Sequence, residues 1–210
     1  MLSVFPISDS WLFVLGTSSA VLAFCAYLPY MRDVLRGVTQ PQRASWLIWS
    51  LLSSIALAAQ VYEGASTSLW FAGSQVASTW IVFLLSIARG QGAFLSRPDE
   101  RALWLATVGI VIWYFTDNAV YALALTITIS LLGGVLTVTK AYQDPESETL
   151  STWVLSFGAA CLAILSVGTL DWALLAYPLY LFVLKTAIIT AILLGRSSAN
   201  RYAAMGLPRF

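Results

Sequence analysis

Lys185 is the residue of this sequence whose type and position most clearly permit chemistry. It is the only charged residue inside an apolar run, and it lies about two residues from the centre of the run 172–194. A lysine at that depth in a bilayer costs roughly 2.5 to 3.5 kcal/mol on insertion scales, and no Asp or Glu lies inside an apolar run to offset the cost. Such a lysine can hold an anion, exchange a proton or form a Schiff base.

A structural explanation competes with these uses. The amine can extend toward the membrane surface along its own stem, or it can donate to the carbonyl of Leu174, which loses its helical donor at Pro178. Extension to the surface would have to bridge roughly 13 Å, nearly half of the hydrocarbon thickness. The position therefore favours a functional lysine and leaves its use open.

Other kinds of site chemistry find no support in the residue types. The chain contains no His, and its two cysteines, Cys25 and Cys161, lie 136 residues apart in apolar runs, where a thiol behaves as a small hydrophobe. Serine nucleophiles have no histidine base, and paired carboxylates occur only between the apolar runs. We predict that the protein is not an enzyme and holds neither a metal nor, unless Lys185 binds retinal, a cofactor.

The elements that would carry Lys185 follow from composition. Of the 210 residues, 59% are hydrophobic and 10% are charged, whereas globular chains carry about 25% charged residues. Apolar runs of about 20 residues match the thickness of a bilayer. The sequence therefore predicts an all-α membrane protein with seven transmembrane helices, at approximately 11–31, 44–62, 66–88, 102–116, 118–139, 150–169 and 172–194.

The charged residues outside these runs are divided between the two sides of the membrane. Every Lys and Arg except Lys185 lies at the end of an odd-numbered span, in the loop that follows it or in the C-terminal tail, whereas Asp9, Glu63, Asp117 and Asp171 lie on the opposite side. The positive-inside rule then places the N-terminus outside and the C-terminus in the cytoplasm. Because the first residues lack the basic start of a signal peptide, we expect the first span to be retained.

The chain also resembles itself at an offset of 107 residues. Trp46 aligns with Trp153 near the starts of two spans, and Arg89 aligns with Arg196 at the ends of two others. The pattern predicts a first three-helix bundle in 1–90, a loop and linker helix in 91–117, a second three-helix bundle in 118–196 and a cytoplasmic tail in 197–210. Equivalent helices of the two bundles would then be parallel.

Several predicted spans carry a stripe of polar or small residues. Gln75 and Ser78 share a face of the third span, Trp46 and Ser53 share a face of the second, and Ser130 lies on a similar stripe of the fifth. Such stripes allow membrane helices to approach closely and to form hydrogen bonds with one another. Their occurrence in both halves also indicates a polar central cavity.

The three-plus-one-plus-three layout resembles the SWEET and PQ-loop (MtN3-like) superfamily of seven-helix membrane transporters, over about residues 12–196. The stretch 27–36, which contains Pro29 and Tyr30, is similar to the end of the family's first helix, where Pro-Gln is usual. Trp46 and Trp49 follow it after a short loop, as in the family.

The acidic segment 144–149 ahead of Trp153 has two interpretations. It looks like the connection between helices five and six in uncharacterised bacterial members of the family. It is equally explained as a helix start in which Ser147 or Thr149 serves as the N-cap residue.

The resemblance implies a bacterial plasma-membrane carrier that moves a small polar or anionic solute by alternating access between two three-helix bundles. It implies hinges at Pro29 and Pro178, and it places Lys185 where the family usually offers an Asn to the substrate. Its partners would be the bilayer and a small-molecule substrate, not nucleic acid, and a homo-oligomer stays open. The expected substrate-binding or coupling residues are Lys185, Gln75, Ser78, Trp46, Trp49, Trp153 and Ser53.

Two other functions stay open. Seven spans with one mid-membrane lysine on the seventh also describe a retinal-binding photoreceptor or light-driven pump, in which Lys185 would form the Schiff base. Leu181 and Gln75 stand where such proteins want carboxylates. KDEL receptors look like the same fold, and in a peptide receptor of that kind a buried lysine would bind a peptide carboxylate.

Overall fold

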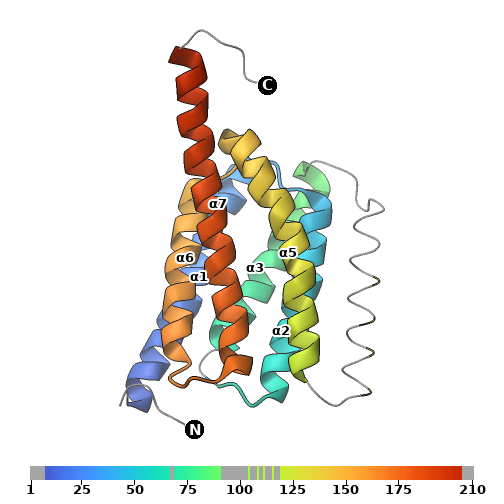
Figure 1. Ribbon diagram of the computed structural model, residues 1–210, viewed down its shortest axis with the longest axis vertical. Coiled ribbons are helices and arrows are strands. Elements are labelled where there is room, and N and C mark those ends of the chain that lie inside the picture. Colours follow the sequence, from blue (N-terminus) through green and yellow to red (C-terminus); the bar gives the residue numbers. More distant parts are fainter. Residues whose placement is uncertain are drawn as a thin grey trace.

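The computed structural model describes residues 8–66, 69–90 and 119–204, together with helical positions 104, 108, 111 and 115. The described chain is helical throughout its regular elements (Figure 1), which confirms the all-α prediction. The fourth predicted span, 102–116, lies outside the described residues except at those four positions. The elements are α1 (Asp9–Leu35), α2 (Arg43–Tyr62), α3 (Leu69–Arg89), α5 (Ala119–Gln143), a short 3-10 turn η1 (Pro145–Ser147), α6 (Leu150–Ser166) and α7 (Trp172–Ala204).

The helices have the length and composition of membrane spans. Within the described residues, five helices are long and apolar enough to cross a bilayer, and α6 is a shorter apolar helix of 17 residues. α1 and α7 continue beyond their predicted ends at 31 and 194, to Leu35 and Ala204. The predicted ends were too early because hydropathy marks where the apolar run stops, whereas a helix can continue into the polar segment beyond it.

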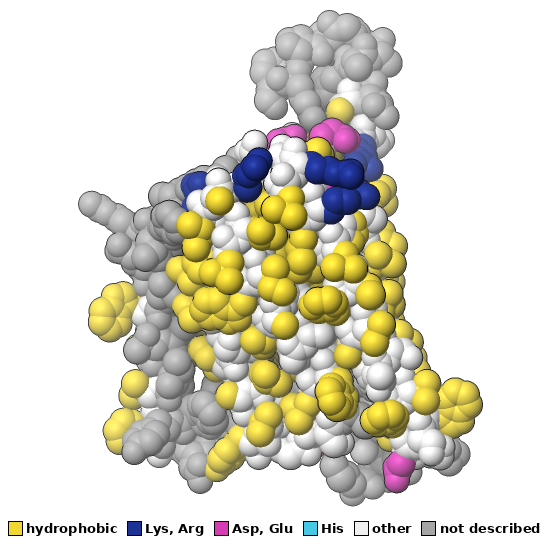
Figure 2. Space-filling view, turned by 180° about the vertical axis from the view of Figure 1, so that it is seen from behind, with side chains coloured by type: hydrophobic (Ala, Val, Ile, Leu, Met, Phe, Trp, Pro, Cys, Tyr) yellow, Lys and Arg dark blue, Asp and Glu magenta, His cyan; other side chains and the backbone are white. Residues whose placement is uncertain are grey.

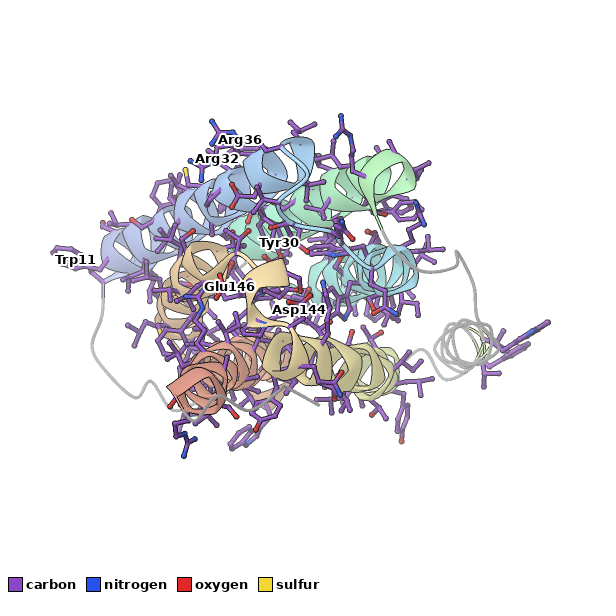
Figure 3. The ribbon with its side chains drawn as sticks, turned by 90° about the horizontal axis from the view of Figure 1, so that it is seen from above. Trp11, Tyr30, Arg32, Arg36, Asp144 and Glu146 are labelled. Carbon is purple, nitrogen blue, oxygen red and sulfur yellow. The ribbon has the colours of Figure 1, made fainter. Side chains whose placement is uncertain are left out.

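The described helices form a closed ring. In contact order the ring runs α1, α3, α2, α5, α7 and α6, and α6 packs back on α1. Each helix therefore has two main neighbours and turns one face toward a common centre, as the view along the bundle shows (Figure 3). The labelled side chain of Tyr30 lies toward that centre, whereas Arg32 and Arg36 lie at the outer edge.

Small residues let α1 and α6 pack closely. Ala23 of α1 is buried in one cluster with Ala159, Ala160 and Ala163 of α6. The Ser19 hydroxyl donates a hydrogen bond across the same interface to the carbonyl of Ala159 at 2.9 Å. Small side chains and interhelical hydrogen bonds are the usual means of joining helices in lipid, where neighbouring apolar surfaces gain little from each other.

The surface reflects a bilayer environment. Figure 2 shows a wide band of hydrophobic side chains below a group of Lys and Arg side chains at one end of the bundle. We call this the basic end; it is where α1 and α5 finish and α2 and α6 begin. Trp11, Trp70 and Trp172, at the starts of α1, α3 and α7, are 64%, 61% and 74% exposed near the opposite end. Aromatic residues in such positions favour the membrane–water boundary.

Candidate functional site

A small cavity lies at the centre of the ring. Its volume is about 30 Å³, which is room for about two water molecules. All six described helices contribute to its wall, which is mainly aromatic with several polar groups. The lining residues are Tyr27, Trp46, Trp49, Ser53, Gln75, Thr79, Ser130, Trp153, Tyr177, Tyr180, Leu181, Leu184 and Lys185.

Among the described residues, Lys185 is the only charged one in that wall, and it is 3% exposed. Its Nζ lies 5.6 Å from the ring centre of Trp153 and 5.9 Å from that of Tyr27. Within the part of the chain that the structure describes, no carboxylate forms an ion pair with Lys185, and no carbonyl or hydroxyl accepts a hydrogen bond from it. Two aromatic faces therefore surround the amine in place of an anionic partner.

The other polar groups of the wall differ in whether they have partners. The Tyr27 hydroxyl is hydrogen-bonded to Gln75, and the hydroxyls of Ser53 and Thr79 lie 3.1 Å apart. By contrast, Trp49 Nε1 and the Tyr180 hydroxyl are buried and have no hydrogen-bond partner among the described residues. An indole N–H can only donate, so the cavity contains donors that lack acceptors.

Most of the site residues predicted from the sequence meet in this cavity. Six of the seven predicted binding residues line it: Lys185, Gln75, Trp46, Trp49, Trp153 and Ser53. Ser78 is fully buried on α3 but is not part of the wall, and its hydroxyl has no partner among the described residues. The two predicted hinge residues, Pro29 and Pro178, lie inside α1 and α7.

The sequence prediction missed much of the wall contributed by α7. Tyr177 and Leu181 lie eight and four residues before Lys185 and line the same cavity, together with Tyr180 and Leu184. Helical periodicity measured backward from Lys185 would have found the first two, because residues four apart share a helix face. Stripes of polar residues do not mark them, because this part of the wall is aromatic and aliphatic.

A polar cluster joins the two halves of the ring at the basic end. Lys140 Nζ lies 3.2 Å from Glu148 Oε1 and donates at 3.1 Å to the carbonyl of Gln40, in the loop between α1 and α2. The hydroxyls of Thr39 and Thr149 lie 2.8 Å apart. We call Thr39, Gln40, Lys140, Glu148 and Thr149 the basic-end latch, since they tie the α1–α2 loop to the α5–α6 connection.

Thr149 has a different role from the helix cap that the sequence suggests. It occupies the N-cap position of α6, but its side chain makes no cap hydrogen bond. The Thr149 hydroxyl lies instead 3.1 Å from Asp33 Oδ2, at the end of α1. Thr149 therefore stands at the predicted N-cap position, but its hydroxyl is used for contact between the halves, which local sequence cannot reveal. The Ser147 hydroxyl likewise donates to the carbonyl of Asp144.

Trp153 connects the latch to the central cavity. Its Nε1 donates a hydrogen bond to Glu148 Oε2 at 3.1 Å, while its ring faces Lys185. A second space of about 10 Å³ lies between the latch and the cavity, too small for one water molecule. Trp46, Trp49 and Trp153 line both spaces, so three indoles separate the cavity from the basic end.

The carboxyl of Glu148 is buried, and its surroundings shift its pKa in opposite directions. Burial raises the pKa of its carboxyl above the usual glutamate value, and the nearby Lys140 ammonium opposes that shift. The indole N–H of Trp153 also favours the charged form, whereas Asp144 disfavours it. The latch thus contains an acid that holds its proton more tightly in the folded protein than in the unfolded chain.

Comparisons with known proteins identify no relative of this chain. No family model matches it, and neither the curated proteins nor the solved structures contain a match. The functional argument therefore depends on the site itself. The site offers a cation and unpaired hydrogen-bond donors inside an aromatic wall, next to a polar latch that closes one end.

Proposed function

We propose that this protein is a membrane carrier that moves a small polar or anionic solute by alternating access between two three-helix bundles. The observation that carries the proposal is the central cavity, whose wall takes residues from all six described helices and contains the buried amine of Lys185. A purely structural bundle has no need for an unpaired cation and an empty polar space at its centre, since both are costly in lipid.

The neighbour relations of the helices support the duplication that such a carrier requires. In the ring, α3 lies between α1 and α2, and α7 lies between α5 and α6. The halves meet where α1 packs on α6 and where α2 packs on α5. Replacing α1, α2 and α3 by α5, α6 and α7 reproduces the same ring, as expected for two parallel repeats about an axis along the membrane normal.

The closed basic end suits one state of an alternating-access cycle. The latch and the three indoles block the path from Lys185 to that end. A solute larger than about two water molecules cannot enter without movement of the two halves, given a cavity of about 30 Å³. Under the positive-inside rule the basic end faces the cytoplasm, so we infer that the structure represents a cytoplasm-closed conformation.

Counterflow uptake in proteoliposomes tests the carrier. The panel contains labelled sugars, short carboxylates and amino acids, and it compares the parent protein with Lys185→Asn. We expect saturable exchange of at least one class, with exchange of an anion reduced at least tenfold in Lys185→Asn because the amine supplies the charge in the wall.

A matched control changes a lysine outside the cavity wall. Lys140→Asn alters the latch but leaves the wall of the cavity intact, so it should change the rate of exchange while preserving the order of preference among solutes. Absence of exchange for every class, from protein that still unfolds cooperatively on heating, would contradict the carrier.

The two alternative functions fit the cavity less well. A retinal Schiff base would need space for a long polyene beside Lys185 and a buried carboxylate to balance its charge, and the described wall offers neither. A visible absorption band after addition of retinal would favour that function. A peptide receptor of the KDEL-receptor kind would instead be supported by binding of C-terminal peptides that depends on Lys185.

A further inference from the structure

We propose that the central cavity is a binding site for the carboxylate of a small organic monoanion, with Lys185 Nζ and Trp49 Nε1 as its donors. The inference deepens the proposed function, and only the claim that the bound anion is a substrate rests on that function. The binding site itself can be tested separately from transport. Three features of the cavity carry it: the donors, the absence of a second charge in the wall, and the volume.

The first feature is an excess of donors. Lys185 Nζ and Trp49 Nε1 both belong to the wall, and neither has a hydrogen-bond partner among the described residues. An ammonium and an indole N–H have no acceptor capacity. Burial of an unsatisfied donor costs about 1 to 3 kcal/mol, so the missing component of the site is an acceptor. A neutral amide or a sugar would bring donors as well.

The amide group of Gln75 is not the primary contact for such a ligand. Gln75 is already hydrogen-bonded to the Tyr27 hydroxyl. The Thr79 hydroxyl donates to the backbone carbonyl of Gln75 at 2.9 Å and lies 3.1 Å from the Ser53 hydroxyl. These groups form a hydrogen-bonded network across α1, α2 and α3. The wall groups that can only donate and have no partner are Trp49 Nε1 on α2 and Lys185 Nζ on α7, and beside them the Tyr180 hydroxyl on α7, also without a partner among the described residues, can donate or accept.

The second feature is the charge balance. Lys185 is the only charged residue that the described part of the chain contributes to the cavity wall, so one negative charge makes the occupied site neutral. A dianion would leave a net negative charge buried in the membrane, at a cost comparable with that of the isolated lysine. The site should therefore prefer a monocarboxylate over a dicarboxylate.

The third feature is the volume of about 30 Å³. It holds about two water molecules, and the two oxygens of one carboxylate occupy a similar space. The closed cavity has room for the carboxylate alone, so the aromatic and aliphatic remainder of the wall, including Trp153, Leu181 and Leu184, must move to admit the short apolar body behind it.

Isothermal titration calorimetry of the full-length protein in detergent tests the site. The ligands are lactate and acetate, their neutral isosteres lactamide and acetamide, the dianion succinate, and chloride. We expect saturable binding of the two monocarboxylates, with at least tenfold weaker binding of the amides, of succinate and of chloride.

Variants assign the donors. Lys185→Met should abolish carboxylate binding, and Trp49→Phe, which keeps an aromatic ring but removes the N–H, should weaken it about tenfold or more, as for loss of a hydrogen bond to a charged group. The matched control is Trp80→Phe: the Trp80 N–H donates to the Ser54 hydroxyl at 3.1 Å, outside the cavity wall. It should bind within twofold of the parent.

The outcomes separate the two proposals. Equal binding of amides or chloride, equal binding of succinate, or carboxylate binding unaffected by both Lys185→Met and Trp49→Phe would overturn the monocarboxylate site, even if counterflow establishes a carrier. Lys185-dependent carboxylate binding without exchange in proteoliposomes would support the site and overturn the carrier. Neither binding nor exchange by protein that unfolds cooperatively would overturn both.

Discussion

At the scale of single residues, the setting of Lys185 shows how a buried charge can persist without a counter-ion. Its Nζ lies within 6 Å of the ring centres of both Tyr27 and Trp153. A desolvated cation–π contact contributes about 2 kcal/mol, so two rings offset much of the roughly 2.5 to 3.5 kcal/mol insertion cost. The amine is thereby stabilised while its hydrogen-bonding capacity stays free for a ligand.

Glu148 gives a residue-scale prediction for pH. Burial raises the pKa of its carboxyl, so the folded protein binds this proton more tightly than the unfolded chain. The contribution of Glu148 to stability is therefore greatest below about pH 4.5, the usual glutamate pKa, and is lost as pH rises through the raised pKa of the folded state. The groups that face it are Lys140, Asp144, Tyr30 and the indole of Trp153.

Thermal unfolding in detergent, followed from pH 4 to pH 8, measures this effect. Relative to Glu148→Gln, the parent protein should lose stability as pH rises from about 4.5, because the variant has no proton to release. Glu146→Gln is the control, since that side chain is 76% exposed and pairs with Arg196 at the surface; it should follow the pH profile of the parent. Parallel profiles for the parent and Glu148→Gln would refute the prediction.

At the scale of elements, two adjacent glycines of α5 pack against residues that line the cavity. A Cβ added at Gly133 would lie 3.1 Å from Trp49 Nε1, and one added at Gly134 would lie 2.7 Å from a methyl carbon of Leu184. Both neighbours line the cavity. The absence of side chains on this face of α5 therefore lets α2 and α7 place their cavity residues close to it.

Gly133→Ala is the corresponding test. The added methyl would displace the Trp49 indole by a few tenths of an ångström, and we expect carboxylate binding to weaken several-fold while the helix itself gains up to about 1 kcal/mol from the replacement of glycine. The measurements are calorimetric affinity and the thermal midpoint. Gly73→Ala on α3 is the control, because a Cβ there meets nothing within 4 Å. Equal affinities for the two variants would argue against Trp49 as a donor.

The helices themselves were largely predictable, and the reason is physical. Apolar runs of bilayer length specify helices, and Lys185 and Gln75 stood out because charged and amide side chains are rare in such runs. The latch was not predictable, because Thr149 and Asp33 meet only after residues 116 positions apart are brought together by the ring. Ser78 shares the predicted face of α3 but does not line the cavity, because helical periodicity gives a face but not its neighbours.

At the scale of the whole molecule, the proposed carrier function predicts that the two halves separate at the latch. The hydroxyl oxygens of Thr39 and Thr149 lie 2.8 Å apart, which makes the pair suitable for a disulfide when both are changed to cysteine. In a background with Cys25 and Cys161 replaced by alanine, oxidation of Thr39→Cys/Thr149→Cys should abolish exchange, and reduction should restore it.

The controls for this prediction are the two single-cysteine variants, which should be insensitive to oxidation. Calorimetric binding to the cross-linked protein is a second readout: the ligand should still bind if it enters from the end opposite the latch. Full exchange by protein shown to be cross-linked would mean that the basic end does not open during transport.

The single positive charge of Lys185 also predicts that membrane voltage acts on the proposed carrier. With its site empty, the membrane interior holds one positive charge; with a monoanion bound, it holds none. A charge that crosses the full membrane field changes energy by about 2.3 kcal/mol per 100 mV, so voltage should act on the return of the empty carrier and hardly at all on the loaded one. Exchange in proteoliposomes should then be indifferent to an imposed potassium diffusion potential, while net uptake should depend on it.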